Sequence, residues 1–272
     1  MIALMLTIEL LAFSPQSSRT ATILQLLHSA APGRARLTHS YQGESDVLVL
    51  WGPGAPDRIV PMAAQRARGG HTLALDLAYW QRGHKFRVSI DAPHPQQWVM
   101  RRDWPASRLQ ADRPPTSDRW NHDGPVIIAG IGRKARAQYG DAVDRWESQM
   151  LAAVQARWPG RRVWYRKKQP DATAPAGVKL TSLSQPIDEL LTGASLLITW
   201  HSNVAVDAIR LGIPVICQDG AAASLCPSSL GDKGPQPLPE PLRRRFLANL
   251  AWFQWSPDEA GAFWRWVPEV LA

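Results

Sequence analysis

Apolar residues in the first part of the chain form short continuous runs that alternate with stretches of helical spacing. The runs predict strands over residues 8–13, 46–51 and 72–77, since a buried strand is short and nearly all apolar. Apolar residues three or four positions apart predict helices over residues 20–29 and 59–68. Strands and helices in alternation indicate a Rossmann-like α/β unit.

From Pro125 the same alternation returns. Strands are predicted for residues 126–129, 162–165, 178–180, 195–199 and 213–217, and helices for residues 141–157, 186–191, 204–211, 240–252 and 257–271. The chain is therefore predicted to form two Rossmann-like α/β domains, residues 1–122 and residues 123–272.

Residues 79–120 lose this periodicity, and Arg, His, Trp and Pro accumulate there. Residues 86–90 alternate and predict one strand. The remainder is predicted to be loop and interdomain connection, ordered by its tryptophans.

Length and composition limit the possible classes. The 272 residues suffice for one large core or two small ones. A net charge of +8 favours anionic partners, and the arginines favour phosphate. The two cysteines form neither a metal pattern nor a disulfide framework, which indicates a reducing compartment.

The N-terminal segment, residues 1–13, is apolar but resembles a signal peptide poorly. It carries Glu9, has no basic region and lacks a cleavage site of small residues, so a first strand is favoured. No apolar run is long enough to span a bilayer. We therefore expect a soluble, cytoplasmic protein without stable membrane insertion.

Residues 194–220 carry the clearest local pattern. A buried strand is followed by the polar turn Trp200-His201-Ser202-Asn203, a helix that Gly212 ends, and a second buried strand. Ligands of open α/β sheets bind at the end of the strand where such a turn lies. Ser202 or Asn203 can cap the helix, whose first N–H groups favour an anion.

This segment resembles the donor-binding half of GT-B glycosyltransferases. The resemblance rests on His201-Ser202, on Asp207-Ala208 and on Gly212-Ile213-Pro214-Val215; Asp207 stands where glutamate is usual. It implies a GT-B-like fold, in which two Rossmann-like domains face a cleft. The N-terminal domain would bind the acceptor and the C-terminal domain a nucleotide-sugar, with Asp207 on the donor ribose.

Three strand ends of the second domain carry groups suited to a nucleoside diphosphate. They are Gly130-Ile131-Gly132 with Arg133 and Lys134, then Arg166 and Lys167, and finally His201, Ser202 and Asn203. Fixed cations and N–H dipoles stabilise a diphosphate leaving group without a metal. No Asp-x-Asp follows a strand, so we expect no metal and no cofactor beyond the donor, a UDP-sugar. An ordinary βα turn with solvated basic residues is the alternative.

Inverting sugar transfer needs a general base for the acceptor hydroxyl. The resemblance implies that this base comes from the N-terminal domain, where the candidates are Asp76, Asp91 and His94, with Asp76 first. A cap or a turn is the alternative role for each aspartate. A retaining reaction would need no such base.

The acceptor is suggested only by charge and by resemblance. Arginines and tryptophans interleave over residues 79–82, 98–104 and 119–120, a combination typical of surfaces that bind nucleic acid. The candidate contacts are Trp80, Arg82, Arg87, Arg101 and Arg102. Residues 247–255, with Gly261 and Trp264, resemble phage-encoded proteins. A transferase acting on a hydroxymethylated base of phage DNA, flipped from the duplex, is the first hypothesis. A lipopolysaccharide or capsule transferase and a non-catalytic nucleotide-binding or nucleic-acid-binding protein are the alternatives. The sugar, the stereochemistry and the oligomeric state are not predicted.

Overall fold

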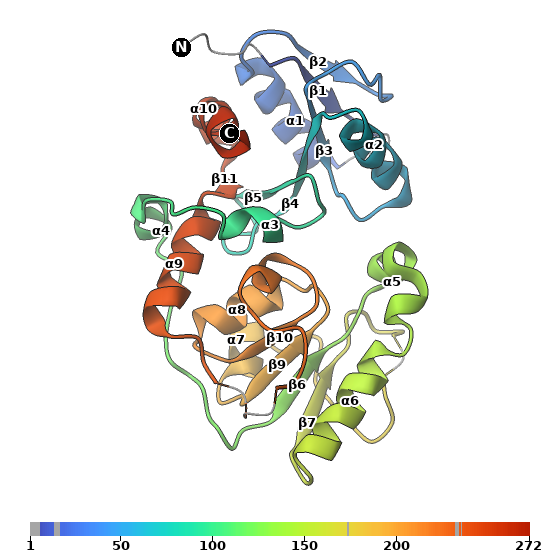
Figure 1. The fold of residues 1–272 in the computed structure, drawn as a ribbon, viewed down its shortest axis with the longest axis vertical. Helices are drawn as coiled ribbons and strands as arrows, with labels where there is room; N and C mark the ends of the chain where they lie inside the picture. The colour runs from blue at the N-terminus through green and yellow to red at the C-terminus, as the bar shows by residue number, and fades with distance from the viewer. Residues whose placement is uncertain (1–5, 14–16, 173, 232–233, 235) are drawn as a thin grey trace. The chain divides into compact units, whose positions relative to one another are not determined.

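The chain folds into two compact α/β units (Figure 1). The computed structural model describes residues 6–13, 17–172, 174–231, 234 and 236–272, so residues 1–5 of the apolar N-terminal segment lie outside the described part. The first unit comprises Met1–Pro95 and Trp252–Ala272, and the second comprises Gln96–Ala251. This division differs from the predicted boundary at residues 122 and 123 in two ways: residues 96–122 belong to the second unit, and the last residues of the chain belong to the first.

The first unit contains a six-stranded sheet in the order β11-β5-β4-β3-β1-β2. Its strands are β1 (Ile8–Leu11), β2 (Ala35–Thr38), β3 (Val47–Trp51), β4 (His71–Leu77), β5 (Phe86–Ile90) and β11 (Gln254–Trp255). The pairs among β1 to β4 are parallel, and β5 is antiparallel to both β4 and β11. The strand order changes direction between β1 and β3, which makes that point a topological switch point.

Helices cover both faces of this sheet. They are α1 (Ser18–Ala30), α2 (Pro56–Ala67) and α10 (Ala260–Leu271), the last preceded by the short helix η3 (Pro257–Glu259). Helices α1 and α2 follow crossovers that run in opposite directions from the switch point, so right-handed connections place them on opposite faces. Helix α10 packs beside α1, where the Trp264 indole donates a 2.8 Å hydrogen bond to the Leu27 carbonyl.

The second unit contains a wholly parallel sheet in the order β10-β9-β6-β7-β8. Its strands are β6 (Val126–Ala129), β7 (Val163–Arg166), β8 (Lys179–Leu180), β9 (Leu196–Thr199) and β10 (Val215–Cys217). Counted along the chain this is the Rossmann order 3-2-1-4-5, whose switch point lies between β6 and β9. Buried apolar runs in β6 and β9 explain their central positions.

The helices of the second unit include several that the sequence did not predict. They are α3 (Gln96–Val99), α4 (Ser107–Asp112), α5 (Arg133–Tyr139), η1 (Gly140–Val143), α6 (Trp146–Arg157), α7 (Ile187–Leu191), α8 (Val204–Arg210), η2 (Ala221–Ser224) and α9 (Glu240–Ala251). The predicted helix over residues 141–157 is thus broken, and α3 and α4 lie in the segment predicted as loop. Among the described residues, no helix has the length and apolar character needed to cross a membrane.

Candidate functional site

The candidate donor site lies at the C-terminal edge of the second sheet. The parallel register aligns Ala129 of β6 with Arg166 of β7 on one side and with Thr199 of β9 on the other. The glycine loop, the basic segment after β7 and the polar turn after β9 therefore start next to one another, as predicted. The turn lies on one side of the switch point and the glycine loop on the other.

Position 130 requires a glycine, because the chain there approaches β7 closely. Its N–H donates to the Arg166 carbonyl at 2.9 Å, which extends the β6–β7 ladder by one residue. A Cβ at this position would lie 2.4 Å from the Tyr165 hydroxyl oxygen. Gly132 is the N-cap of α5, and a Cβ there would lie 2.9 Å from Cγ of Lys168, a side chain that can move.

Glu147, on α6, binds the backbone of the glycine loop through a buried carboxylate. Its buried carboxylate accepts hydrogen bonds from the Ile131 N–H at 2.8 Å and from the Tyr165 hydroxyl at 2.6 Å, and it pairs with Arg136. Burial, together with this carboxylate, raises the pKa of Tyr165, so the hydroxyl stays a donor. One N–H of the loop is therefore used by the protein itself.

Arg166 supports a neighbouring loop. Its guanidinium donates to the carbonyl oxygens of Ser182 at 2.6 Å and Leu183 at 3.0 Å. Burial lowers the pKa of Arg166. In this structure the side chain holds the connection between β8 and α7, and its predicted contact with a diphosphate stays a prediction.

Three further cations lie around the glycine loop. Arg133 is exposed and pairs with Asp171 on the surface. Lys134 is exposed at the start of α5, and Lys167 Nζ donates to the Pro170 carbonyl at 3.4 Å. An exposed ion pair contributes about 0–1 kcal/mol, so Arg133 can exchange Asp171 for a ligand phosphate at little cost.

The polar turn after β9 is fixed by hydroxyl groups. The Ser202 N–H donates to Thr199 Oγ1 at 3.2 Å, and Ser202 Oγ accepts from the Val204 N–H at 3.4 Å. Ser202 thus caps the start of α8 with its side chain, whereas Asn203 holds the N-cap position without a side-chain hydrogen bond to the helix. His201 is left half-buried at the sheet edge.

An aromatic group next to this turn was not predicted. The ring of Tyr139 lies 5.5 Å from that of Trp200 and 5.8 Å from that of His201, centroid to centroid. The Tyr139 hydroxyl donates to the Asp219 carboxylate. Burial raises the pKa of Tyr139 most, and the hydrogen bond to Asp219 raises it further. A Cβ on Gly220 would lie 3.0 Å from the His201 carbonyl oxygen, so this turn packs closely against the next strand end.

Asp207 lies inside the unit. Every residue of α8 is buried, and the Asp207 carboxylate is 3.7 Å from the Arg210 guanidinium. Arg210 also pairs with Asp188 at 2.7 Å. The aspartate therefore belongs to an ion-pair network around the buried Arg210, and its predicted contact with a donor ribose stays a prediction.

The candidate bases of the first unit lie at different ends of its sheet. Asp76, near the C-terminal end of β4, pairs across the sheet with Arg87 of β5 at 3.0 Å and accepts from the Leu77 N–H at 2.8 Å. Its side chain is 38% exposed, whereas that of Arg87 is only 2% exposed. Asp76 is thus a carboxylate oriented by a buried cation and still open to solvent.

Asp91 lies at the opposite end of β4. It accepts from the Thr72 N–H and contacts His71 Nδ1, both at 2.8 Å, with a positive φ of 55°. His94 is buried in the following loop. Of the three candidates, Asp76 alone combines exposure with the strand end at which ligands bind.

The predicted nucleic-acid residues are divided between the units. Trp80, Arg82 and Arg87 belong to the first unit, and Arg101 and Arg102 to the second. Trp80 is only 8% exposed and therefore offers no face on which a base can stack.

In the second unit, the arginines lie over tryptophans of their own segment. The guanidinium carbon of Arg101 is 4.7 Å from the centre of the Trp98 ring, and that of Arg102 is 4.0 Å from the Trp104 ring. Each of these cation–π contacts occupies one face of a tryptophan ring.

No group of three or more His, Cys, Asp or Glu side chains in the described part of the chain is arranged to hold a metal ion. No family model matches the chain, and no curated protein matches it in sequence.

Solved structures do resemble it, and they define the fold as GT-B. The Thermosulfurimonas dismutans KpsC beta Kdo 2,4 transferase superposes with a TM-score of 0.59 at 13% identity, covering 98% of each chain. The KpsC beta Kdo 2,7 transferase of the same organism gives a TM-score of 0.55 at 12% identity, covering 97% of this chain and 99% of that one. The predicted fold class of two Rossmann-like units is confirmed.

Proposed function

We propose that the protein is a glycosyltransferase that moves a sugar from a nucleotide-sugar to a hydroxyl group of a cell-surface glycan. The observation that carries this proposal is the switch point of the second sheet. There the glycine loop, the exposed cations and the aromatic His201 turn meet at the edge where α/β sheets bind ligands.

The groups at this edge match the parts of a nucleotide-sugar. Arg133, Lys134 and Lys167 supply positive charge for the diphosphate, which gains negative charge as the sugar leaves. Tyr139 and His201 supply ring faces for the base or the sugar. This set works through fixed charge and orientation, so we propose a metal-independent transfer.

Asp76 is the proposed general base. Its carboxylate is exposed enough to reach an acceptor hydroxyl, and the buried Arg87 fixes its orientation. Deprotonation of the hydroxyl as it attacks the sugar carbon would give transfer with inversion.

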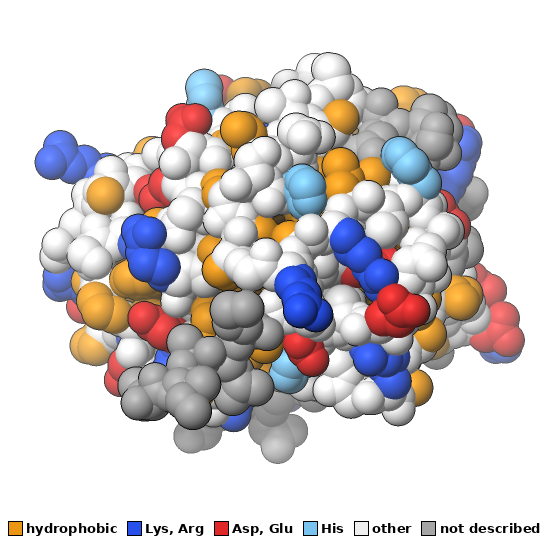
Figure 2. All heavy atoms as spheres, turned by 90° about the horizontal axis from the view of Figure 1, so that it is seen from above, with side chains coloured by type: hydrophobic (Ala, Val, Ile, Leu, Met, Phe, Trp, Pro, Cys, Tyr) orange, Lys and Arg blue, Asp and Glu red, His pale blue; other side chains and the backbone are white. Residues whose placement is uncertain are grey.

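A glycan acceptor is favoured over a DNA base. Trp80 is buried, and an arginine occupies one face of Trp98 and one face of Trp104. On the face drawn in Figure 2, Lys and Arg side chains stand apart, with Asp and Glu between several of them, rather than forming a continuous stripe. The two similar solved structures reported above are named as beta Kdo transferases. Salt-sensitive binding to duplex DNA would restore the DNA-base hypothesis.

A donor screen tests the proposal directly. UDP-, GDP- and CMP-activated sugars are added to the full chain, and the melting temperature is measured. A nucleotide-sugar that binds only the folded state raises the melting temperature. At a hundred times its Kd it adds about 2.7 kcal/mol to the free energy of unfolding. If none of the donors changes the melting temperature at millimolar concentration, the proposed function is wrong.

His201→Ala is predicted to weaken binding of that donor about tenfold, because one ring contact or hydrogen bond contributes on the order of 1 kcal/mol. The fold should persist, since His201 is only half-buried. Titration of the melting temperature with donor measures the change. His122→Ala is the matched control, an exposed histidine that precedes β6. Equal donor affinity in the two variants would remove His201 from the site.

A further inference from the structure

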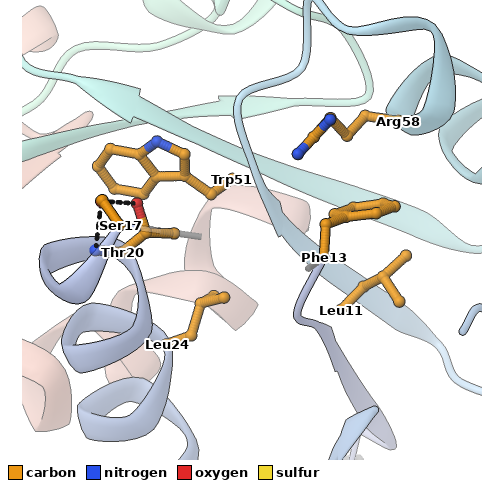
Figure 3. Close-up of a pocket in the computed structure, with 7 residues that line it drawn as sticks. All are labelled: Leu11, Phe13, Ser17, Thr20, Leu24, Trp51 and Arg58. Atoms are coloured by element: carbon orange, nitrogen blue, oxygen red, sulfur yellow. Dashed lines mark hydrogen bonds between the residues drawn. The ribbon is translucent and has the colours of Figure 1, made fainter. Parts of the chain in front are cut away.

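A small pocket lies in the first unit at the C-terminal edge of its sheet (Figure 3). It has a volume of about 140 Å³ and is lined by Leu11, Phe13, Ser17, Thr20, Leu24, Trp51 and Arg58. These residues come from the end of β1, the start of α1, the end of β3 and the first turn of α2. None of them belongs to the donor site described above.

The position of this pocket is the one at which an open α/β sheet binds a ligand. Strands β1 and β3 are neighbours, and the chain leaves them in opposite directions, toward β2 and toward β4. A crevice opens at such a switch point because the connecting helices lie on opposite faces. Leu11 and Trp51, at the ends of these two strands, line it.

The walls of the pocket combine rings, hydroxyls and one cation. Phe13 and Trp51 present aromatic side chains to the space, as Figure 3 shows, and Leu11 and Leu24 form an apolar wall. On the side formed by α1, next to Leu24, Ser17 Oγ and Thr20 Oγ1 are hydrogen-bonded at 3.0 Å. Mostly apolar walls with a few convergent polar groups are the usual composition of a ligand site.

Arg58 supplies the charge. Its guanidinium carbon lies 4.4 Å from the centre of the Phe13 ring, which holds the group over the pocket. Nη1 donates to both carboxylate oxygens of the adjacent Asp57, at 2.5 and 2.6 Å. Asp57 is 55% exposed, so water can readily take over its contact. Nε and Nη2 make no hydrogen bond to any residue that the structure describes.

We infer that this pocket binds an anionic sugar ring of the acceptor, with the anion on Arg58, the ring against Phe13 and Trp51, and ring hydroxyls on Ser17 and Thr20. Arginine recognises carboxylate and phosphate with a planar fork of donors. The volume is well below the roughly 300–1,000 Å³ of sites for drug-sized ligands, so the pocket holds one ring rather than a chain. The inference rests on the proposed function, because it assigns the chemical class of that reaction's acceptor.

The test compares three monosaccharides on the full chain: glucuronate, glucose 6-phosphate and glucose. Dissociation constants are measured by nuclear magnetic resonance titration. At least one of the two anions is expected to bind about tenfold more tightly than glucose, the effect of one charge-assisted hydrogen-bonded pair. Whether glucuronate or glucose 6-phosphate binds more tightly shows whether the pocket prefers a carboxylate or a phosphate on the sugar.

Arg58→Gln should remove this preference for an anion. Arg34→Gln should keep it: Arg34 loses the same charge in the same unit, but it is exposed just before β2, at the other edge of the sheet. Should Arg58→Gln fail to fold, Arg58→Lys keeps the charge without the planar fork and should reduce the preference.

Equal affinity for glucose and both anions, or an unchanged preference in Arg58→Gln, would overturn the inference. The donor screen on the same protein separates the two proposals. A donor that raises the melting temperature, with no preference for an anionic sugar, leaves the proposed function standing and removes this acceptor class. A preference for an anionic sugar without any donor binding leaves the anion pocket standing and removes sugar transfer.

Discussion

Asp76→Asn is expected to lower the rate of sugar transfer by roughly a hundredfold to ten-thousandfold, the usual contribution of a general base. Asparagine keeps the size of the side chain and an oxygen that can accept the Arg87 hydrogen bond. It cannot take the proton of an acceptor hydroxyl. The measurement is the initial rate of transfer at saturating donor, with donor binding followed by thermal shift and expected to be unchanged.

Asp91→Asn is the control for this variant. Asp91 carries the same chemical group at the other end of β4, where it caps the Thr72 N–H, so its loss should affect stability more than the rate per folded molecule. If folded Asp76→Asn transfers sugar at the full rate, the base lies elsewhere. A loss of stability with an unchanged rate would instead show that Asp76 serves only as the partner of Arg87.

Glu147→Ala is expected to lower the free energy of unfolding of the second unit by about 3 kcal/mol, the cost of removing one partner from a buried ion pair. The substitution leaves the Ile131 N–H and the Tyr165 hydroxyl without their acceptor and Arg136 without its closest carboxylate. Chemical denaturation followed by tryptophan fluorescence measures the change.

Two further variants show whether burial is the cause. Glu147→Gln keeps an acceptor for the loop and should lose less stability. Asp144→Ala removes an exposed carboxylate 4.0 Å from the same Arg136, which should cost no more than about 1 kcal/mol. Equal losses in Glu147→Ala and Asp144→Ala would contradict a structural role for the buried carboxylate.

The sequence predicts each strand of the described structure except β2 and β11, and the clearest signals are continuous apolar runs. Strands β3, β6 and β9 are buried along most or all of their length, and a run of valine, leucine and isoleucine is the direct mark of such burial. Strand β2, Ala35–Thr38, is only half-buried along its length and leaves no such run. Helix α5 was missed for the same reason, since Ala135 is its only buried residue.

The predicted domain boundary differs from the observed units in part because a strand near the end of the chain pairs with a strand far earlier in the sequence. Strand β11 contains only two residues, and it joins the first sheet by pairing with Phe86 and Arg87. Apolar spacing shows that residues 257–271 are helical, but it does not show which sheet a helix covers. Apolar periodicity is a property of neighbouring residues, so it does not reveal which distant segments pair.

The candidate site was predicted in position more than in detail. The strand ends at Gly130 and His201 are adjacent, because parallel strands end at a common edge. The partners of individual side chains could not be predicted from the sequence, since they depend on tertiary packing. Glu147 looks like any polar residue of a helix, and Arg166 like any basic residue of a loop, until the elements packed against them are known.

The pairing of β11 with β5 also sets an order of assembly. All strands of the second unit lie before residue 252, whereas the first sheet receives its last strand, and α1 its partner helix α10, from residues 254–271. During synthesis from the N-terminus, the nascent chain thus contains the whole second unit while the first still lacks an edge strand and the Trp264 indole that bonds Leu27. Of the two units, the one that begins earlier along the chain is the last that can be completed.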